Sequence, residues 1–235
     1  MIDAAQLADL TAATERMLAT AADIDDAGFV EPSLLPGWTR GHVAAHVAGN
    51  AEGVRNLMLA ARTAKPIPMY ASQALRNANI EVGAGRSAVV QLDDLRGSAE
   101  RLRIEIEWFP DGAWDNKFRF NVEDPESPRA PARALVAARN FEVEMHHIDL
   151  DAGYGFADSP PELISAFLSR VTAALGATEL SVVANDPDLG RSWTIGAGAT
   201  SVSGTSAQLL AWLSGRSDGD GVTAIGGTLP DVPSL

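Results

Sequence analysis

The stretch Arg139-Asn-Phe-Glu-Val-Glu-Met-His-His-Ile-Asp-Leu150 decides how the rest of the chain is interpreted. It has the pattern of the last turns of a helix, and it carries two of the four histidines in the protein. Glu142 and His146 are four residues apart, so they share one face of that helix. Far upstream, Gly41-His-Val-Ala-Ala-His46 places two more histidines at the same spacing. Two helices that each present such a face can together hold one metal ion.

Apolar residues recur with helical spacing over most of the first 150 positions. The pattern predicts four long helices and one short one, which are separated by segments rich in proline and glycine. Thr39 is the expected N-cap of the second long helix. Residues 113–122 alternate in part, which predicts a pair of strands or an extended loop. Four long helices favour a bundle, in which metal sites form from inward side chains on facing helices. The long helices are expected at residues 3–23, 40–63, 87–109 and 131–150, and the short one at 72–81.

The sequence changes in character after Gly153-Tyr-Gly155. Short β-like segments alternate with two helical segments beyond that point, which predicts a smaller α+β domain. The expected fold class is therefore α+β, with a helical bundle over residues 1–153 and the smaller domain over residues 154–235. The expected helices span 161–178 and 206–213, and the expected strands span 180–184, 192–195, 200–203 and 222–225.

Charge and hydropathy exclude several classes of partner. The 235 residues carry a net charge of −13, which disfavours nonspecific binding of nucleic acid or of anionic membranes. An anionic substrate would be repelled at long range, so its binding needs local arginines. No apolar run approaches the roughly 18 residues of a membrane span, and the first residues lack the pattern of a signal peptide. We therefore expect a cytoplasmic protein, and a monomer because no heptad seam is present.

The chain has no cysteine. Disulfides, thiolate metal ligands and a cysteine nucleophile are therefore all excluded. If the protein performs thiol chemistry, the thiol must come from another molecule.

Histidine and glutamate are the remaining candidates for metal ligands. Catalytic zinc sites use three such protein ligands and leave one position open. Neither helix carries the His-Glu-x-x-His motif, so a protease of that class is disfavoured. A histidine pair at this spacing can also be a hydrogen-bonded core or surface pair, and spacing alone does not tell whether the two helices are neighbours. The candidates are His42, His46, Glu142, His146 and His147.

Three other residues have weaker signals. Asn50 continues the face of the upstream histidine pair and is compatible with either a cavity or an ordinary helix surface. Asp149 follows His146 by three residues, so it can orient that imidazole or be solvated at the helix end. Arg216, in a glycine-rich loop, can bind an anionic substrate as a forked donor or simply be solvated.

Several segments resemble one family, the mycothiol-dependent maleylpyruvate isomerases, whose N-terminal part is a DinB-like four-helix bundle. The segment Leu35-Pro-Gly-Trp-Thr-Arg-Gly-His-Val-Ala-Ala-His-Val-Ala-Gly-Asn50 resembles the signature of the family's second helix. Arg139–Leu150 resembles its pattern Arg-x-x-Glu-x-x-x-His-x-x-Asp-Leu. Shorter resemblances occur at Pro68–Tyr70, at Arg76-Asn77, at Val202–Gly204 and at Gly215–Val222.

The resemblance implies a site and a reaction. The zinc ligands, or those of another divalent metal, would be His46, Glu142 and His146, and the catalytic arginine would be Arg216. The loop after Arg216 departs slightly from the family in the order of its serine, glycine and aspartate residues. Mycothiol would supply the missing thiol, and a small-molecule substrate, maleylpyruvate, would be converted from cis to trans to give fumarylpyruvate, a step of gentisate-type aromatic degradation.

Two alternatives remain open at the level of sequence. A zinc-dependent mycothiol S-transferase would use the same bundle and metal but would consume the thiol by conjugating another electrophile. A non-catalytic bundle that binds a small ligand or a partner protein would use the histidines as core residues.

Overall fold

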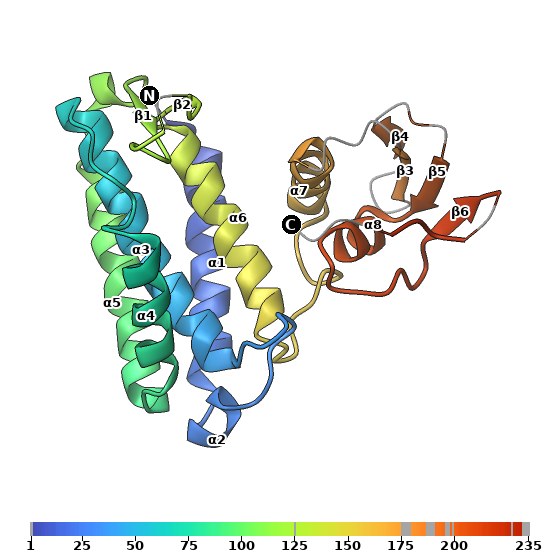
Figure 1. Ribbon diagram of the computed structural model, residues 1–235, viewed down its shortest axis with the longest axis horizontal. Coiled ribbons are helices and arrows are strands. Elements are labelled where there is room, and N and C mark those ends of the chain that lie inside the picture. Colours follow the sequence, from blue (N-terminus) through green and yellow to red (C-terminus); the bar gives the residue numbers. More distant parts are fainter. Residues whose placement is uncertain are drawn as a thin grey trace. The chain divides into compact units, whose positions relative to one another are not determined.

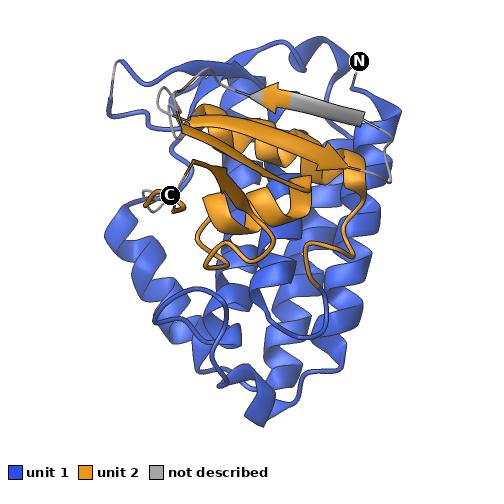
Figure 2. Cartoon of the chain, turned by 90° about the vertical axis from the view of Figure 1, so that its right-hand side faces the viewer, with its two compact units in different colours: residues 1–154 blue, residues 155–235 orange. Residues whose placement is uncertain are grey.

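A computed structural model describes residues 2–124, 126–174, 180–186, 191–195, 198, 200–226 and 228–231. The chain forms two compact units, residues 1–154 and residues 155–235 (Figure 2). Among the described residues, no helix is both long enough and apolar enough to cross a membrane.

The first unit is a bundle of four long helices, as the sequence predicted (Figure 1). α3 packs against α5, α6 and the shorter α4, while α1 packs against α5 and α6. The bundle helices are α1 (Ala4–Ala22), α3 (Arg40–Thr63), α5 (Ala88–Glu107) and α6 (Ala134–Asp149), and the additional helices are α2 (Asp26–Phe29) and α4 (Gln73–Ala84).

α3 lies at the centre of the unit because its residues are small and apolar on several faces. Small side chains let the backbones of neighbouring helices approach closely. Apolar side chains stabilise the contact because burying them removes apolar surface from water. Thr39 caps the helix as expected, because its hydroxyl accepts a hydrogen bond from the backbone of His42. The buried side chains include Val43, Ala44, Val47, Ala51, Val54, Leu57 and Met58.

Two boundaries differ from the sequence prediction. α6 begins at Ala134 rather than near residue 131, because β2 (Arg129–Pro131) pairs antiparallel with β1 (Lys117–Arg119). Of this pair, which follows the 3₁₀ turn η1 (Asp111–Ala113), only β1 lies within residues 113–122, where the sequence predicted a strand pair or an extended loop; its partner β2 lies further along the chain. α4 continues through Gly83 to Ala84 instead of breaking there. A Cβ at Gly83 would lie 2.6 Å from the Cβ of Ala45. The glycine thus serves close packing between α3 and α4 rather than helix termination.

The second unit is the α+β part of the predicted fold. Its four-stranded sheet has the order β4-β3-β5-β6, with β3 and β5 parallel and the other neighbours antiparallel. α8 packs against α7 and against β3 and β5. The predicted helix over 161–178 is described only to residue 174, and residues 175–179 lie outside the described part. The elements are α7 (Pro161–Ala174), β3 (Leu180–Asp186), β4 (Arg191–Ile195), β5 (Thr200–Gly204), α8 (Ser206–Leu213) and β6 (Thr223–Ile225).

Candidate metal centre

α3 and α6 bring together three of the predicted metal-ligating side chains: His46, Glu142 and His146. One ligand atom from each lies within 4.8 Å of the others. Nε2 of His46 is 3.3 Å from Oε2 of Glu142, and Nε2 of His146 is 3.6 Å from the same oxygen. The sequence predicted only the pairs within each helix, whereas the packing of α3 on α6 joins the two faces into one cluster.

The donor set fits a divalent cation. Two imidazole nitrogens and one carboxylate oxygen are the three-ligand set of many catalytic zinc sites, which leave a position open. Within the described part of the chain, Glu142 forms ion pairs with histidines alone. Arg139 interacts with Glu142 electrostatically but forms no direct ion pair with it, so the carboxylate oxygens remain available to a cation. A set of two histidines and one carboxylate also accepts other divalent ions than zinc.

Asp149 orients His146. Its carboxylate Oδ2 lies 2.8 Å from Nδ1 of the imidazole, and the aspartate is fully buried at the end of α6. Although burial lowers the pKa of His146, Asp149 and then Glu142 together hold this pKa above its usual value. The contact fixes the plane of the ring and directs Nε2 toward the cluster, as carboxylates commonly do for metal-binding histidines.

Asn50 and Arg139 orient Glu142. The guanidinium of Arg139 donates to the backbone oxygen of Val47 at 2.9 Å and to Oδ1 of Asn50 at 2.7 Å. Because that amide oxygen accepts from Arg139, the amide nitrogen of Asn50 faces the other way and donates to Oε2 of Glu142 at 3.1 Å. Asn50 and Arg139 are buried, so this chain of hydrogen bonds holds the carboxylate in place.

The electrostatics of His46 and Glu142 favour cation binding at neutral pH. Burial is the main cause that lowers the pKa of His46 to about 4, so its ring is neutral at neutral pH. Burial opposes ionisation of Glu142, but hydrogen bonds with His146 and His46 hold its pKa well below the usual range. A neutral imidazole and an ionised carboxylate are the forms that bind a metal. The raised pKa of His146 means that a cation would have to displace the proton of that ring.

A cavity of about 420 Å³ opens beside the cluster in the first unit. His46, Tyr70 and Arg76 line it, together with residues of α3, α4 and the intervening loop. The loop approaches α3 closely at Gly53, where an added Cβ would lie 2.8 Å from the side chain of Met69 and 3.1 Å from the ring of Tyr70. The cavity gives a small molecule access to the His46 side of the site.

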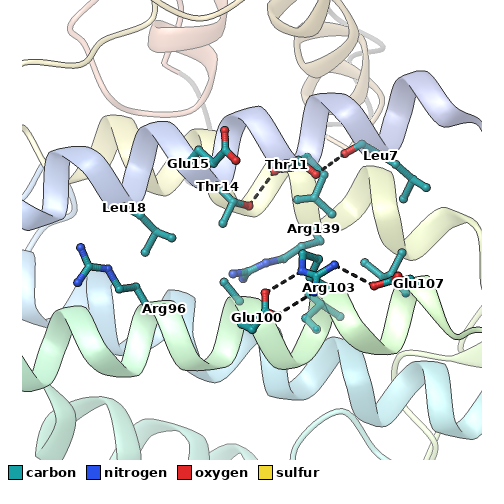
Figure 3. A pocket seen from close by; sticks show the side chains of 14 residues that line it. Leu7, Thr11, Thr14, Glu15, Leu18, Arg96, Glu100, Arg103, Glu107 and Arg139 are labelled. Atoms are coloured by element: carbon teal, nitrogen blue, oxygen red, sulfur yellow. Dashed lines mark hydrogen bonds and ion pairs between the residues drawn. The ribbon is translucent and has the colours of Figure 1, made fainter.

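Arg139 does not line that cavity. It instead borders a second cavity of about 360 Å³ between α1 and α5, where its side chain lies between the two helices (Figure 3). Arg139 therefore holds Asn50 from the side away from Glu142. Burial lowers the pKa of Arg139 itself to about 10.

The other two histidines are held by different partners. His42 belongs to the N-terminal cap of α3, where Nδ1 accepts from the backbone N–H of Thr39, and Nε2 lies 3.3 Å from Glu81. His147 points to α1, with Nε2 at 2.8 Å from the hydroxyl of Thr20. Neither histidine joins the cluster of His46, Glu142 and His146.

Arg216 belongs to the second unit, in the loop that follows α8. Its backbone N–H donates to the oxygen of Ala211 at 2.8 Å, and its guanidinium donates to the oxygen of Ser214 at 2.7 Å. These contacts anchor the loop, and a catalytic role for Arg216 stays a prediction.

The sequence did not assign a role to Arg76, which proves to be a neighbour of the site. One of its guanidinium nitrogens lies 3.1 Å from Nδ1 of His46. Two signals were available: an acidic chain needs local arginines for an anionic substrate, and the segment Arg76-Asn77 resembles the family. Neither assigned a role to this arginine.

Comparison with known proteins agrees with this architecture. The family model described as "Mycothiol maleylpyruvate isomerase N-terminal domain" matches residues 10–151, and the model of the C-terminal domain of the same family matches residues 158–234. The chain is similar to the crystal structure of a mycothiol-dependent maleylpyruvate isomerase, with 30% identity, a TM-score of 0.86 and coverage of 98% of this chain and 95% of that one. A mutant of a mycothiol-dependent maleylpyruvate isomerase matches with 29% identity, a TM-score of 0.85 and the same coverage. No curated protein sequence matches significantly. These matches confirm the resemblance drawn from the sequence.

Proposed function

Because the chain belongs to the mycothiol maleylpyruvate isomerase family, we propose that it converts maleylpyruvate into fumarylpyruvate with mycothiol as the thiol. The observation that carries the proposal is the cluster of His46, Glu142 and His146, whose three donor atoms converge within 4.8 Å. The absence of cysteine from the chain agrees with a thiol that arrives from outside.

His46, Glu142 and His146 would hold a divalent cation, with zinc as the expected ion. Such a cation supplies a Lewis acid that lowers the pKa of a thiol from about 8.5 and so makes thiolate available at neutral pH. The residues of the chain provide the rest: Asp149 orients one imidazole, and Asn50 orients the carboxylate.

The reaction needs no net proton transfer. The cis alkene of the substrate accepts the sulfur at one carbon, a C–S bond forms, and the π electron pair moves to the conjugated carbonyl as an enolate. The former double bond is now a single bond and rotates. The enolate then returns its electron pair, the C–S bond breaks, and the trans alkene and the thiolate leave. We assign to Arg216 the stabilisation of the enolate or of a substrate carboxylate, as a forked cationic donor.

Turnover with a catalytic amount of thiol tests the proposal. Purified protein loaded with zinc should consume maleylpyruvate only when mycothiol is added, and many substrate molecules should be converted for each thiol. Product that appears without thiol would overturn the proposed mechanism. Consumption of one thiol for each product would instead identify an S-transferase, and a metal-loaded protein that converts no maleylpyruvate would contradict the assigned substrate.

A further inference from the structure

We infer that Arg76 binds a carboxylate of the substrate in the cavity beside His46, and that metal binding at His46 releases Arg76 for this task. The inference rests on the proposed function for the identity of the substrate. It concerns α4 and the cavity of the first unit, and it does not depend on Arg216.

The positive charge of Arg76 has no carboxylate partner among the residues that the structure describes. Its guanidinium donates to Oδ1 of Asn77 at 3.0 Å and to Nδ1 of His46 at 3.1 Å, and its central carbon lies 5.8 Å from the centre of the Tyr70 ring. All three partners are uncharged when the histidine is neutral. A half-buried arginine without a carboxylate is suited to bind an anion from solution.

Arg86 lines the same cavity but, unlike Arg76, has a carboxylate partner. Its guanidinium forms an ion pair with Asp94, so its charge is compensated within the protein. Arg76 is therefore the arginine of this cavity that is available to a substrate anion. A chain with a net charge of −13 needs a local cation to bind an anionic substrate, and Arg76 supplies one.

The contact between Arg76 and His46 sets the tautomer of the histidine. A guanidinium has hydrogen-bond donors only, so Nδ1 of His46 must accept and the neutral ring carries its hydrogen on Nε2. That nitrogen lies 3.3 Å from Oε2 of Glu142, which is suited to accept the hydrogen. The arrangement is thus a continuous set of hydrogen bonds from Arg76 through His46 to Glu142.

A cation at the cluster is incompatible with that tautomer. Nε2 of His46 faces Glu142 and His146, so it is the nitrogen that would bind the ion, and it must then carry no hydrogen. A neutral ring in this state has its hydrogen on Nδ1, where it opposes the donors of Arg76. Arg76 must leave Nδ1, and the adjoining cavity of about 420 Å³ is the space into which its guanidinium can turn.

Maleylpyruvate has two carboxylates and a reactive alkene between them. Binding one carboxylate to Arg76 would orient the alkene in the cavity next to the metal-binding side chains. Arg76 would leave His46 only when a metal ion is bound. The subsite for the carboxylate and the metal site would therefore become ready for the reaction together.

Calorimetric binding of maleate, a dicarboxylate that lacks the rest of the substrate, tests the inference without turnover. The experiment compares wild type and Arg76→Gln, each zinc-loaded and metal-free, with no thiol present. In the zinc-loaded protein, Arg76→Gln should weaken maleate binding about 10- to 100-fold, because a charged hydrogen-bonded pair is lost. In the metal-free protein the same change should have a clearly smaller effect.

Arg86→Gln is the matched control, and it should change maleate affinity less than about threefold. Arg76→Lys should fall between wild type and Arg76→Gln, since lysine keeps the charge but not the fork. An equal zinc content in all variants shows that the metal site is intact. Equal maleate affinity of zinc-loaded wild type and Arg76→Gln would overturn the inference, as would an effect of the same size in the metal-free protein.

Nitrogen-15 NMR of the imidazoles gives a second readout that does not involve binding or activity. The signal of His46, assigned with His46→Gln, should show the hydrogen on Nε2 in the metal-free protein and on Nδ1 after zinc is added. A hydrogen on Nδ1 in both states would contradict the proposed release of Arg76. Because neither experiment requires isomerase activity, a failure of maleylpyruvate turnover would refute the proposed function and leave these results interpretable.

Discussion

α6 carries two pairs of glutamate and histidine, and their environments are opposite. Glu142 and His146 face α3, and 28% of the Glu142 side chain is exposed. Glu144 and His147 face α1, and the Glu144 side chain is fully buried. Glu144 is neutralised by an ion pair with Arg16 and accepts a hydrogen bond from the hydroxyl of Tyr154 at 3.0 Å. The ring of His147 stacks on Tyr154, with 3.8 Å between the ring centres.

The difference between the pairs lies in their partners rather than in their own residue types. An arginine already satisfies the charge of Glu144, so this carboxylate joins α1 to α6 and has no charge left for an ion. Glu142 contacts two imidazoles and an amide, and among the described residues it forms no ion pair with an arginine or lysine. We therefore interpret Glu144, which faces an arginine, as a structural group, and propose Glu142, which faces two imidazoles and an amide, as a metal ligand.

The largest expected effect is on activity, when a ligand on the metal-binding face of α6 is removed. His146→Ala removes a ligand, and a metal ion contributes several kcal/mol to transition-state stabilisation, so the rate should fall by on the order of 10³-fold or more. Zinc content, measured by elemental mass spectrometry, should fall with it. A His146→Ala enzyme that retained both zinc and turnover would show that the cluster is not the site.

The second effect concerns stability, on the other face of α6. Glu144→Ala removes the carboxylate partner of Arg16, whose side chain is 34% exposed, so solvent partly compensates its charge and the free energy of unfolding in urea should fall by about 1–3 kcal/mol. The double variant Arg16→Met/Glu144→Met should recover much of this loss, because no charge remains unpaired. Zinc content of both variants should stay near that of wild type, and a loss of zinc at native conditions would refute the structural role.

A smaller effect is expected when a ligand is kept and only the residue that orients it is changed. Asp149→Asn keeps the shape of the side chain but weakens the contact with Nδ1 of His146, so zinc affinity should fall about 10- to 100-fold. Competition with a chelator of known affinity measures this change. Unchanged affinity would mean that Asp149 does not orient the ligand.

The smallest effect is expected for His42, which lies outside the cluster. His42→Ala removes one half of the capping box of α3, which should lower the free energy of unfolding by roughly 0.5–1 kcal/mol. Zinc affinity and thiol-dependent turnover should remain those of wild type. A tenfold loss of zinc affinity in this variant would place His42 within the metal site.

The sequence predicted the four helices and the pairing of Glu142 with His146, because these depend on spacing along one helix. It predicted the α+β second unit from the change to short β-like segments after Gly155. It could not tell His46 from His42 by spacing, since the choice depends on which side of α3 meets α6 in the folded chain. The roles of Arg76 and Arg139 were also beyond its reach, because their partners lie 30 and 89 residues away in the sequence. The start of α6 was misjudged because the pairing of β1 with β2 outweighs local helical preference.

The measurement that tests the account most directly is the zinc bound per chain in Glu142→Gln and in Glu144→Gln. The two substitutions are chemically identical and lie two residues apart on the same helix. The account predicts that Glu142→Gln loses the metal after dialysis and that Glu144→Gln retains it. Equal zinc content in the two variants, or its loss in Glu144→Gln alone, would contradict the assignment of Glu142 as the carboxylate ligand.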